Sequence, residues 1–420
     1  MRFSSISILV FLTLNIYAQN SFDAFNIITT KCGVCHNLTK SSPFSLLTYT
    51  DIQKHLNMIE YVVEKNIMPP VFIDTNYRHF TNVTTLNIEE KNKILTWIKD
   101  GANYNDKMNV PYGFSDRDKK PLYDFKKKLE IGTKLGNTNK DLFITKVTTL
   151  PIKDSVVVTN YKYIIKNKFL HHTEILDLSL NTRKKTSISE TYEDKNLVVN
   201  INRYLFGWFP GSDIGVFPEG TGIKIYGDKQ FLILSHYVPT LQRFEEKSYV
   251  LFQTKKKNEE IREIFEFSLW GTSKFLSRNR NKPFLNANEV KTYLFTDTIQ
   301  YDMSAFTMYF HAHHYCQNMI AYAVTPENDT IPLLKIDKWN FEKQIAYRMD
   351  YYLKIPKNSI VYCSALFDNT ENNLDNPIIP TKDVYASFDA EDEMFEFFIM
   401  HLKYQEGDEK NKIIYNAIEY

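Results

Sequence analysis

The sequence contains little glycine, 13 residues in 420, and no excess of charge of either sign. Lys and Arg number 51 against 50 Asp and Glu, so the formal net charge is only +1. A chain with this balance has no excess of positive charge that would argue for nucleic acid or an anionic membrane as a partner. We therefore expect neither as a partner.

Long hydrophobic runs are also missing beyond the N-terminal segment, where no stretch reaches the ~18 apolar residues that a transmembrane helix needs. At the N-terminus, Arg2 precedes an apolar run from Ile6 to Ile16, and the small residue Ala18 follows. This pattern indicates a signal peptide over residues 1–18, with a retained anchor as the alternative. The sequence thus predicts a periplasmic or secreted protein without a transmembrane segment in its mature chain.

Cysteine is scarce as well, with four residues in the chain. Cys32 and Cys35 belong to one short motif, which leaves Cys316 and Cys363. Export favours a disulfide bond between these two. Two buried free thiols are the alternative.

The short motif is Cys-x-x-Cys-His, which is typical of covalent attachment of a c-type haem. Cys32 and Cys35 would bind the haem vinyl groups, and His36 would be an axial ligand of the iron. A redox dithiol and half of a zinc site are the alternatives. A zinc site needs further Cys or His ligands nearby, and the fifteen residues after His36 contain none. Met68, which precedes two prolines, is the candidate second axial ligand; an ordinary buried methionine is the alternative.

Residues 20–105 carry short helical patterns around this motif. Asn87 and Glu90 form a capping-box pattern ahead of an apolar helix that stops at Gly101. The segment resembles the cytochrome c domains of bacterial multi-domain oxidases, which implies a small all-α haem domain. The polar, Lys-rich residues 106–140 indicate a linker.

From residue 141 onward, short β-branched and aromatic runs alternate with turn residues, which predicts an antiparallel β-sandwich over 141–285. Two of its strand-like runs contain His171-His172 and His236. Exported proteins use neutral imidazole to bind copper or zinc. Adjacent strand residues point to opposite faces, so either the strand is distorted at the histidine pair or only one of the two binds. One exposed and one hydrogen-bonded core histidine are the alternative.

His311 and His313 stand two residues apart at the end of another strand-like run, in a third block over residues 286–410. On a strand they share a face, whereas His314 points away. Met394 is a candidate third ligand, because a thioether beside two imidazoles suits copper that cycles between Cu(I) and Cu(II). Spacing alone cannot select Met394, and a surface His-x-His with a core methionine is the alternative.

The second and third blocks together resemble the copper type II, ascorbate-dependent monooxygenases, such as peptidylglycine α-hydroxylating and dopamine β-monooxygenase. The likeness spans about 250 residues and rests on short elements in a fixed order. They are His171-His172, Pro218-Glu219-Gly220, His236-Tyr237, His311-Ala312-His313, Phe367-Asp368-Asn369-Thr370 with Asn372-Asn373, and Asp392-Glu393-Met394.

This resemblance implies two copper ions. An electron-transfer copper would be held by His171, His172 and His236, and a catalytic, O₂-binding copper by His311, His313 and Met394. The family's adjacent histidine pair does ligate one copper. The resemblance also implies two antiparallel jelly-roll domains with a solvent-filled cleft between the coppers. The expected fold class is therefore multidomain: a small all-α cytochrome c domain followed by two all-β jelly-roll sandwiches.

Together these features predict a haem–copper monooxygenase that hydroxylates a C–H bond of a small-molecule or peptide substrate with O₂. Electrons would come from an external donor through the haem, with ascorbate or another reductant as an option. Bacterial relatives usually have Arg-Gly after the His-x-His, and its absence here leaves the substrate contacts open. The alternative function is an electron-transfer cytochrome c fused to a non-catalytic β-sandwich binding module.

Overall fold

The computed structural model describes most of the chain. The described residues are 21–36, 44–70, 72–109, 123–130, 134–139, 141–178, 201–209, 215–227, 229–256, 260–341, 343–387 and 391–416. The expected signal peptide at 1–18 and part of the expected linker, including residues 110–122, lie outside these ranges. Among the described residues, no helix has both the length and the apolar character needed to cross a membrane.

The chain divides into two compact units. One consists of Met1–Val71, Asn82–Pro121 and Glu419–Tyr420, and the other of Phe72–Thr81 and Leu122–Ile418. The helices of the first unit include η1 (Ile28–Cys32), α2 (Tyr49–Gln53), α3 (Leu56–Glu64), α4 (Ile88–Lys99) and η2 (Asp106–Asn109). The predicted capping box is present, because Asn87 accepts from the Glu90 N–H and Glu90 accepts from the Asn87 N–H.

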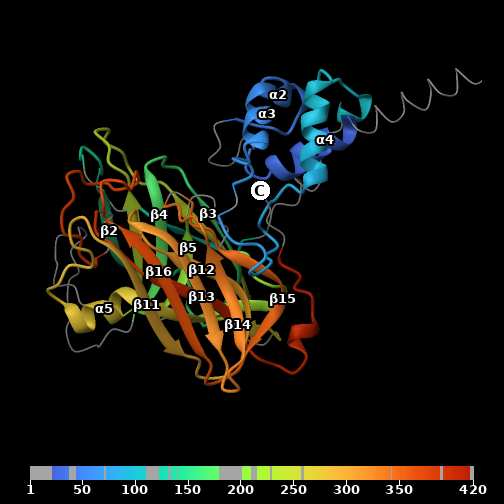
Figure 1. Ribbon diagram of the computed structural model, residues 1–420. Coiled ribbons are helices and arrows are strands. Elements are labelled where there is room, and N and C mark those ends of the chain that lie inside the picture. Colours follow the sequence, from blue (N-terminus) through green and yellow to red (C-terminus); the bar gives the residue numbers. More distant parts are fainter. Residues whose placement is uncertain are drawn as a thin grey trace, which may run out of the picture. The chain divides into compact units, whose positions relative to one another are not determined.

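The second unit contains four small sheets of its own (Figure 1). In spatial order, sheet 1 is β1 (Phe125–Lys128), β8 (Tyr249–Lys256), β3 (Val156–Ile164), β6 (Thr221–Ile225) and β9 (Arg262–Glu263); sheet 2 is β2 (Leu142–Thr149), β7 (Gln230–Tyr237), β4 (Leu170–Leu178) and β5 (Ile201–Trp208). Sheet 3 is β10 (Phe265–Trp270), β17 (Glu396–Lys403), β12 (Met303–His311) and β15 (Tyr347–Ile355); sheet 4 is β11 (Val290–Thr298), β16 (Ile360–Asp368), β13 (Cys316–Val324) and β14 (Thr330–Ile336). The helix α5 (Gly271–Asn279) follows β10, and η3 (Asp408–Lys410) follows β17.

Aromatic side chains hold the sheets face to face. Between sheets 1 and 2, the rings of Tyr161 and Phe206 lie 4.9 Å apart. Between sheets 2 and 3, the rings of Tyr204 and Tyr309 lie 5.9 Å apart, and both side chains are buried. Large aromatic side chains contribute much of the apolar area that such interfaces remove from water. The contact between sheets 2 and 3 therefore joins the first half of the β-rich unit (sheets 1 and 2) to the second half (sheets 3 and 4).

The expected fold class is wrong. Among the described residues 41% lie in strands and 16% in helices, and the four small sheets form a β-propeller-like ring instead of an all-α cytochrome domain followed by two jelly rolls. The physical reason lies between sheets 2 and 3: side chains such as Tyr204 (4% exposed) and Tyr309 (4% exposed) are buried where two independent domains would each present a solvated face.

The segment Phe72–Thr81 also departs from the expectation, because it belongs to the β-rich unit although it lies within residues 20–105. Lys335 Nζ on β14 contacts Asp74 Oδ2 at 2.8 Å. The Tyr77 hydroxyl donates to the Ala321 carbonyl at 3.1 Å, and Arg78 Nε donates to the Pro332 carbonyl at 2.7 Å. Hydrogen bonds to carbonyls of β13 and β14 thus anchor this segment on sheet 4.

Cys316 and Cys363 are buried free thiols. In the β13–β16 ladder, Cys316 pairs with Phe367 and Cys363 pairs with Ala321. The two cysteines are therefore four positions apart along β16 (367 − 363 = 4), which corresponds to roughly 13 Å at 3.3 Å per residue. A disulfide bond needs Cα atoms within about 7 Å, so this register favours the free thiols.

Candidate metal centre

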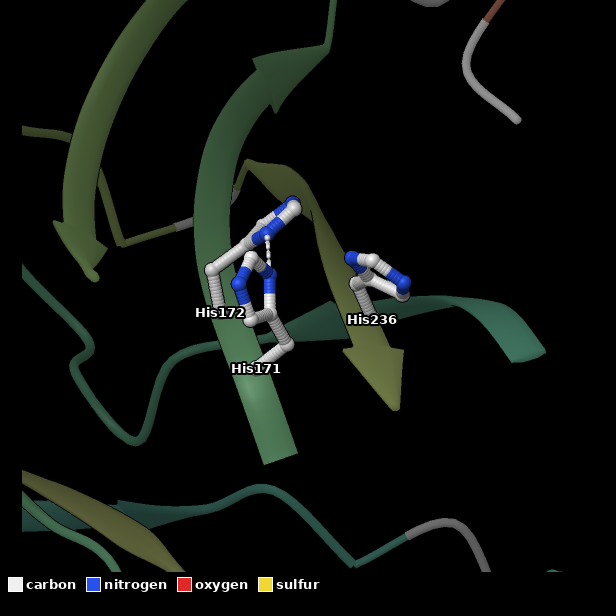
Figure 2. Close-up of side chains that lie close together, drawn as sticks. All are labelled: His171, His172 and His236. Carbon is white, nitrogen blue, oxygen red and sulfur yellow. Dashed lines mark hydrogen bonds between the residues drawn. The ribbon is translucent and has the colours of Figure 1, made fainter. Parts of the chain in front are cut away.

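Three histidines of sheet 2 converge on one point. His171 and His172 lie on β4 and His236 lies near the end of β7, and the three side chains turn toward one another (Figure 2). Each offers a ring nitrogen, and these atoms all lie within 4.8 Å of one another. The three side chains are 5%, 4% and 1% exposed. Among the described residues, this is the one group of three or more His, Cys, Asp or Glu side chains that could hold a metal ion. We call it the first histidine set.

A break in the strand register explains how adjacent residues of β4 reach the same point. Leu170 pairs with Tyr237, but His172 already pairs with His236, so the register shifts between Leu170 and His172. His171 is the extra residue of this irregularity. A bulge of this kind places two residues of one strand opposite one residue of its partner and redirects a side chain. The strand is thus distorted at the histidine pair, which was one of the two outcomes that the sequence left open.

Contacts to neighbouring side chains orient the rings of the first histidine set. The Nδ1 atoms of His171 and His172 face each other at 3.2 Å. His236 Nε2 lies 2.7 Å from Asp141 Oδ1, which fixes the orientation of its ring. A carboxylate that holds one nitrogen of a histidine orients the other nitrogen toward the metal. Phe143 stacks on the His236 ring at 4.1 Å and restricts its rotation further.

Burial keeps the imidazole of His172 in the neutral form that binds metals. The pKa of His172 is held well below its ordinary value, first by burial and then by the neighbouring His236 and His171. A neutral imidazole has a lone pair available for a metal, whereas an imidazolium does not. His172 therefore needs no deprotonation near neutral pH before it can bind an ion.

A second group of candidate ligands lies at the end of β12. His311 is the last residue of β12, and His313 follows two residues later; their rings are 5.3 Å apart. His311 Nδ1 lies 2.6 Å from Gln344 Oε1, and His313 Nδ1 lies 3.0 Å from the Asp392 carbonyl oxygen. Burial lowers the pKa of His311 to about 4 and holds that of His313 well below its usual range. Nε2 is therefore the nitrogen that each ring would present to a metal.

Met394 is brought to this pair by the buried carboxylate of Glu393. That carboxylate accepts the backbone N–H groups of His313, Tyr315 (2.9 Å) and Met394 (2.7 Å). It thereby joins the turn after β12 to the segment before β17, although these lie about 80 positions apart in sequence (394 − 313 = 81). Met394 is 7% exposed. We call His311, His313 and Met394 the second ligand set.

The two sets meet at a small cavity between sheets 2 and 3, with a volume of about 40 Å³. His172 lines this cavity together with His311, His313 and Met394. The ring centroids of His172 and His311 are only 6.1 Å apart. The family resemblance implied a solvent-filled cleft between two copper sites, and here the two sets are in ring-to-ring proximity instead, because the two sheets pack directly on each other.

No sequence motif indicated several residues of this region. Asp141 and Gln344 hold His236 and His311 but belong to no motif. Glu174 and Glu396 line the cavity beside the ligands, and burial raises the pKa of Glu174 to about 8. Two-residue periodicity could have found Glu174, because it lies two positions after His172 on the same face of β4.

The haem-motif residues lie in the N-terminal unit. Cys32 ends η1 and is partly buried against the helical core, whereas Cys35 is exposed. The Cys35 and His36 N–H groups donate to the Cys32 carbonyl at 3.1 and 2.8 Å, so one tight turn presents both thiols and the imidazole. The His36 ring lies 4.5 Å from that of Phe44. Met68 follows α3, where its N–H donates to the Val62 carbonyl at 3.2 Å, and its side chain is half-buried.

Comparison with known proteins assigns no family. No protein-family model matches the chain, and no curated protein matches it. A solved structure of the infectious bursal disease virus Gt strain covers 68% of this chain and 86% of its own, at 10% identity and a TM-score of 0.14. A TM-score this low indicates no shared fold, so this likeness carries no information about function.

Proposed function

We propose that the protein is an exported haem–copper monooxygenase. In the reaction, R–H, O₂, two electrons and two protons give R–OH and water. The observation that carries this proposal is the proximity of two ligand sets beside one cavity. His172, one of three clustered histidines, lines it on one side, and two imidazoles with a thioether line it on the other. Either set alone could be a storage site, but two redox-competent sets in proximity suit a reaction that needs two electrons.

The donor atoms fit copper. Imidazole nitrogen binds both oxidation states, and the soft thioether favours Cu(I). Bound there, copper would supply O₂ binding and one-electron transfer. His171, His172 and His236 would hold one ion, and His311, His313 and Met394 the other. The single-residue bulge on β4 and the Glu393 carboxylate are the two features of this chain that assemble the sets.

The surrounding residues would hold the ligands and keep water out. Asp141 and Gln344 fix the rings of His236 and His311, so that their ligand nitrogens point inward. Phe341 covers both sets, with its ring 4.9 Å from that of His171 and 5.6 Å from that of His313. Exclusion of bulk water protects reactive oxygen chemistry from side reactions.

A c-type haem is the proposed electron source in the N-terminal unit. Cys32 and Cys35 would bind it covalently, His36 would be one axial ligand, and Met68 would be the other. The turn that carries the first three residues presents them within five positions of chain, as the attachment chemistry requires. A one-electron donor outside the cytoplasm would reduce this haem, with ascorbate as an alternative reductant.

The test is metal content combined with O₂ uptake on the purified full-length protein. We expect one haem and two coppers per chain, and O₂ consumption that depends on a reductant. One haem without copper, even after reconstitution, would contradict the proposal and leave an electron-transfer cytochrome with a binding module. Copper without reductant-dependent O₂ consumption would reduce the protein to a copper-binding role.

A further inference from the structure

Beyond the ligand sets, the cavity between sheets 2 and 3 contains a second group of polar side chains that the proposed copper chemistry does not use. Glu174 of β4 and Glu396 of β17 enter it from opposite sheets. No Lys or Arg is among the residues that line this cavity. Two carboxylates that face one enclosed space without a cation are costly, because burial of a charge needs an opposite charge or several hydrogen bonds.

The partners of these side chains are incomplete. The Glu396 carboxylate accepts hydrogen bonds from Thr272 and from the Gly271 N–H. Glu396 is only 2% exposed, and its Oε2 atom has no hydrogen-bond partner among the described residues. The hydroxyl of Tyr204, a residue 4% exposed, likewise has no partner in the described part of the chain and lines the same cavity. Buried polar atoms without a hydrogen-bond partner are rare in folded proteins, and a bound ligand would supply the missing partner.

Aromatic rings complete the wall. Tyr309 and Phe398 stack at 4.3 Å, and Trp270 meets Phe398 edge-on at 5.2 Å. All three line the cavity, as does Tyr204. The faces of aromatic rings attract cations through their quadrupole, and this attraction grows when the cation is desolvated. The carboxylates and the aromatic faces that line this cavity would both attract a small cation.

Strand register places this group next to the second ligand set. Glu396 pairs directly with His311 across the β12–β17 ladder. Glu174 lies two residues beyond His172 on the same face of β4, a step of about 7 Å. A ligand atom held by the carboxylates would thus have its neighbouring atoms within reach of His311 and Met394.

We infer that this cavity binds a primary ammonium group, held by Glu174 and Glu396 and enclosed by Tyr204, Tyr309 and Trp270. The inference deepens the proposed function and partly rests on it, because a substrate anchored by its ammonium group would present an adjacent carbon to the second ligand set. The small volume, about 40 Å³, favours an unbranched ammonium over a quaternary one.

Binding to the metal-free full-length protein tests the inference apart from any copper chemistry. Ethylammonium would be titrated by calorimetry, with ethanol as the neutral analogue of similar size and tetramethylammonium as the bulky cation. We expect saturable binding of ethylammonium alone. N-acetyl-lysinamide serves as a second arm: its binding would assign the ammonium to a peptide side chain, and its exclusion would assign it to a free small amine.

Variants locate the site. Glu174→Gln and Glu396→Gln should each weaken ethylammonium binding at least tenfold, because each removes one charge partner, whereas Glu245→Gln, at an exposed glutamate, should not change it. Thermal unfolding checks that each variant is folded, and Tyr204→Phe is a milder substitute that should weaken binding by a smaller factor. Absence of ethylammonium binding, equal binding of ethanol, or unchanged binding in both glutamate variants would overturn the inference, whatever the copper content proves to be.

Discussion

The imidazole rings of His172 and His311 lie 6.1 Å apart, although they belong to different sheets and to parts of the chain separated by 139 positions (311 − 172 = 139). Sheets 2 and 3 bring them together by burying Tyr204 against Tyr309 a few residues away. The two ligand sets are thus held at a fixed separation by the same aromatic packing that joins the halves of the β-rich unit. Their mutual geometry depends on the core and not on a loop.

We predict that the two ligand sets bind copper independently enough to be separated by mutation. His236→Ala should remove about one of two coppers per chain, and Met394→Leu should weaken the other at least tenfold while leaving the fold intact, since Met-to-Leu exchange in a core costs less than about 1.5 kcal/mol. Copper titration with a competing chelator measures both. Met349→Leu, at a buried methionine of β15, is the matched control and should bind two coppers normally. Loss of both coppers in either variant would contradict separate sites.

Asp141 should act as a positioning residue for His236. Asp141→Asn keeps the shape but weakens the 2.7 Å contact to His236 Nε2 that orients the ring. Loss of such an outer partner lowers metal affinity by about 10- to 100-fold. Metal titration of the first histidine set checks the value, with the electronic spectrum of bound Cu(II) as a second readout of altered ring orientation. Asp154→Asn, at an exposed aspartate, should leave both unchanged; a wild-type affinity in Asp141→Asn would show that the ring needs no such support.

The candidate site shows what sequence patterns can and cannot predict. Resemblance selected His171, His172 and His236, and the structure places them together. Strand periodicity alone argued against the adjacent pair, because the register shift between Leu170 and His172 depends on how β4 pairs with β7. A bulge depends on how two strands pair, so the sequence of one strand alone does not predict it.

The fold was misjudged for a related reason. Tyr204 and Tyr309 lie in strands whose neighbouring residues are buried on both faces. The sequence of such a strand does not say whether the sheet that covers a face belongs to the same domain or to another. Only the pairing of specific faces decides how the four sheets are grouped. The segment around Asp74 and Tyr77 was equally unpredictable, because its anchoring residues Lys335 and Ala321 lie about 250 positions away (335 − 74 = 261; 321 − 77 = 244).

His401 should make the stability of the β-rich unit depend on pH. Its ring is buried on β17, with Nε2 2.9 Å from the Tyr301 hydroxyl, and burial lowers its pKa to about 4 from an ordinary 6.5. Lys403 Nζ lies 5.7 Å from the ring of Tyr301, the hydrogen-bond partner of His401. Because the unfolded chain binds the proton first, stability should be full above pH 6.5 and fall as the pH drops toward 4. The loss is at most about 3 kcal/mol, at 1.36 kcal/mol per pKa unit.

Denaturant unfolding between pH 4.5 and 7.5 measures this slope. His401→Gln should be less stable at pH 7.5 but should show a flatter dependence on pH than the unmodified protein. His79→Gln, at a histidine whose side chain is 70% exposed, should keep the original slope. An unchanged slope in His401→Gln would assign the acid sensitivity to other groups.

Asp408 ties the C-terminal turn to two sheets, and its removal should be costly. The carboxylate accepts two hydrogen bonds from Arg262 at 2.8 and 2.7 Å, one from the Ser304 hydroxyl at 2.6 Å and one from the Gln405 N–H at 3.0 Å. Burial alone would raise its pKa, but these donors outweigh burial and the net pKa is lowered. Its stabilisation is therefore present above the unfolded value, near 3.9, and is lost as the pH falls through the lower folded value.

Asp408→Leu should destabilise the β-rich unit by about 2–4 kcal/mol, mainly because it leaves the Arg262 guanidinium without its charge partner. Replacing that partner as well, in the double variant Arg262→Met with Asp408→Leu, should recover much of the loss, since an apolar pair avoids the desolvation cost of an unmatched charge. Denaturant unfolding at pH 7 measures all three proteins. A double variant no more stable than Asp408→Leu would mean that the bonds from Ser304 and Gln405, and not the ion pair, supply most of the stabilisation at this turn.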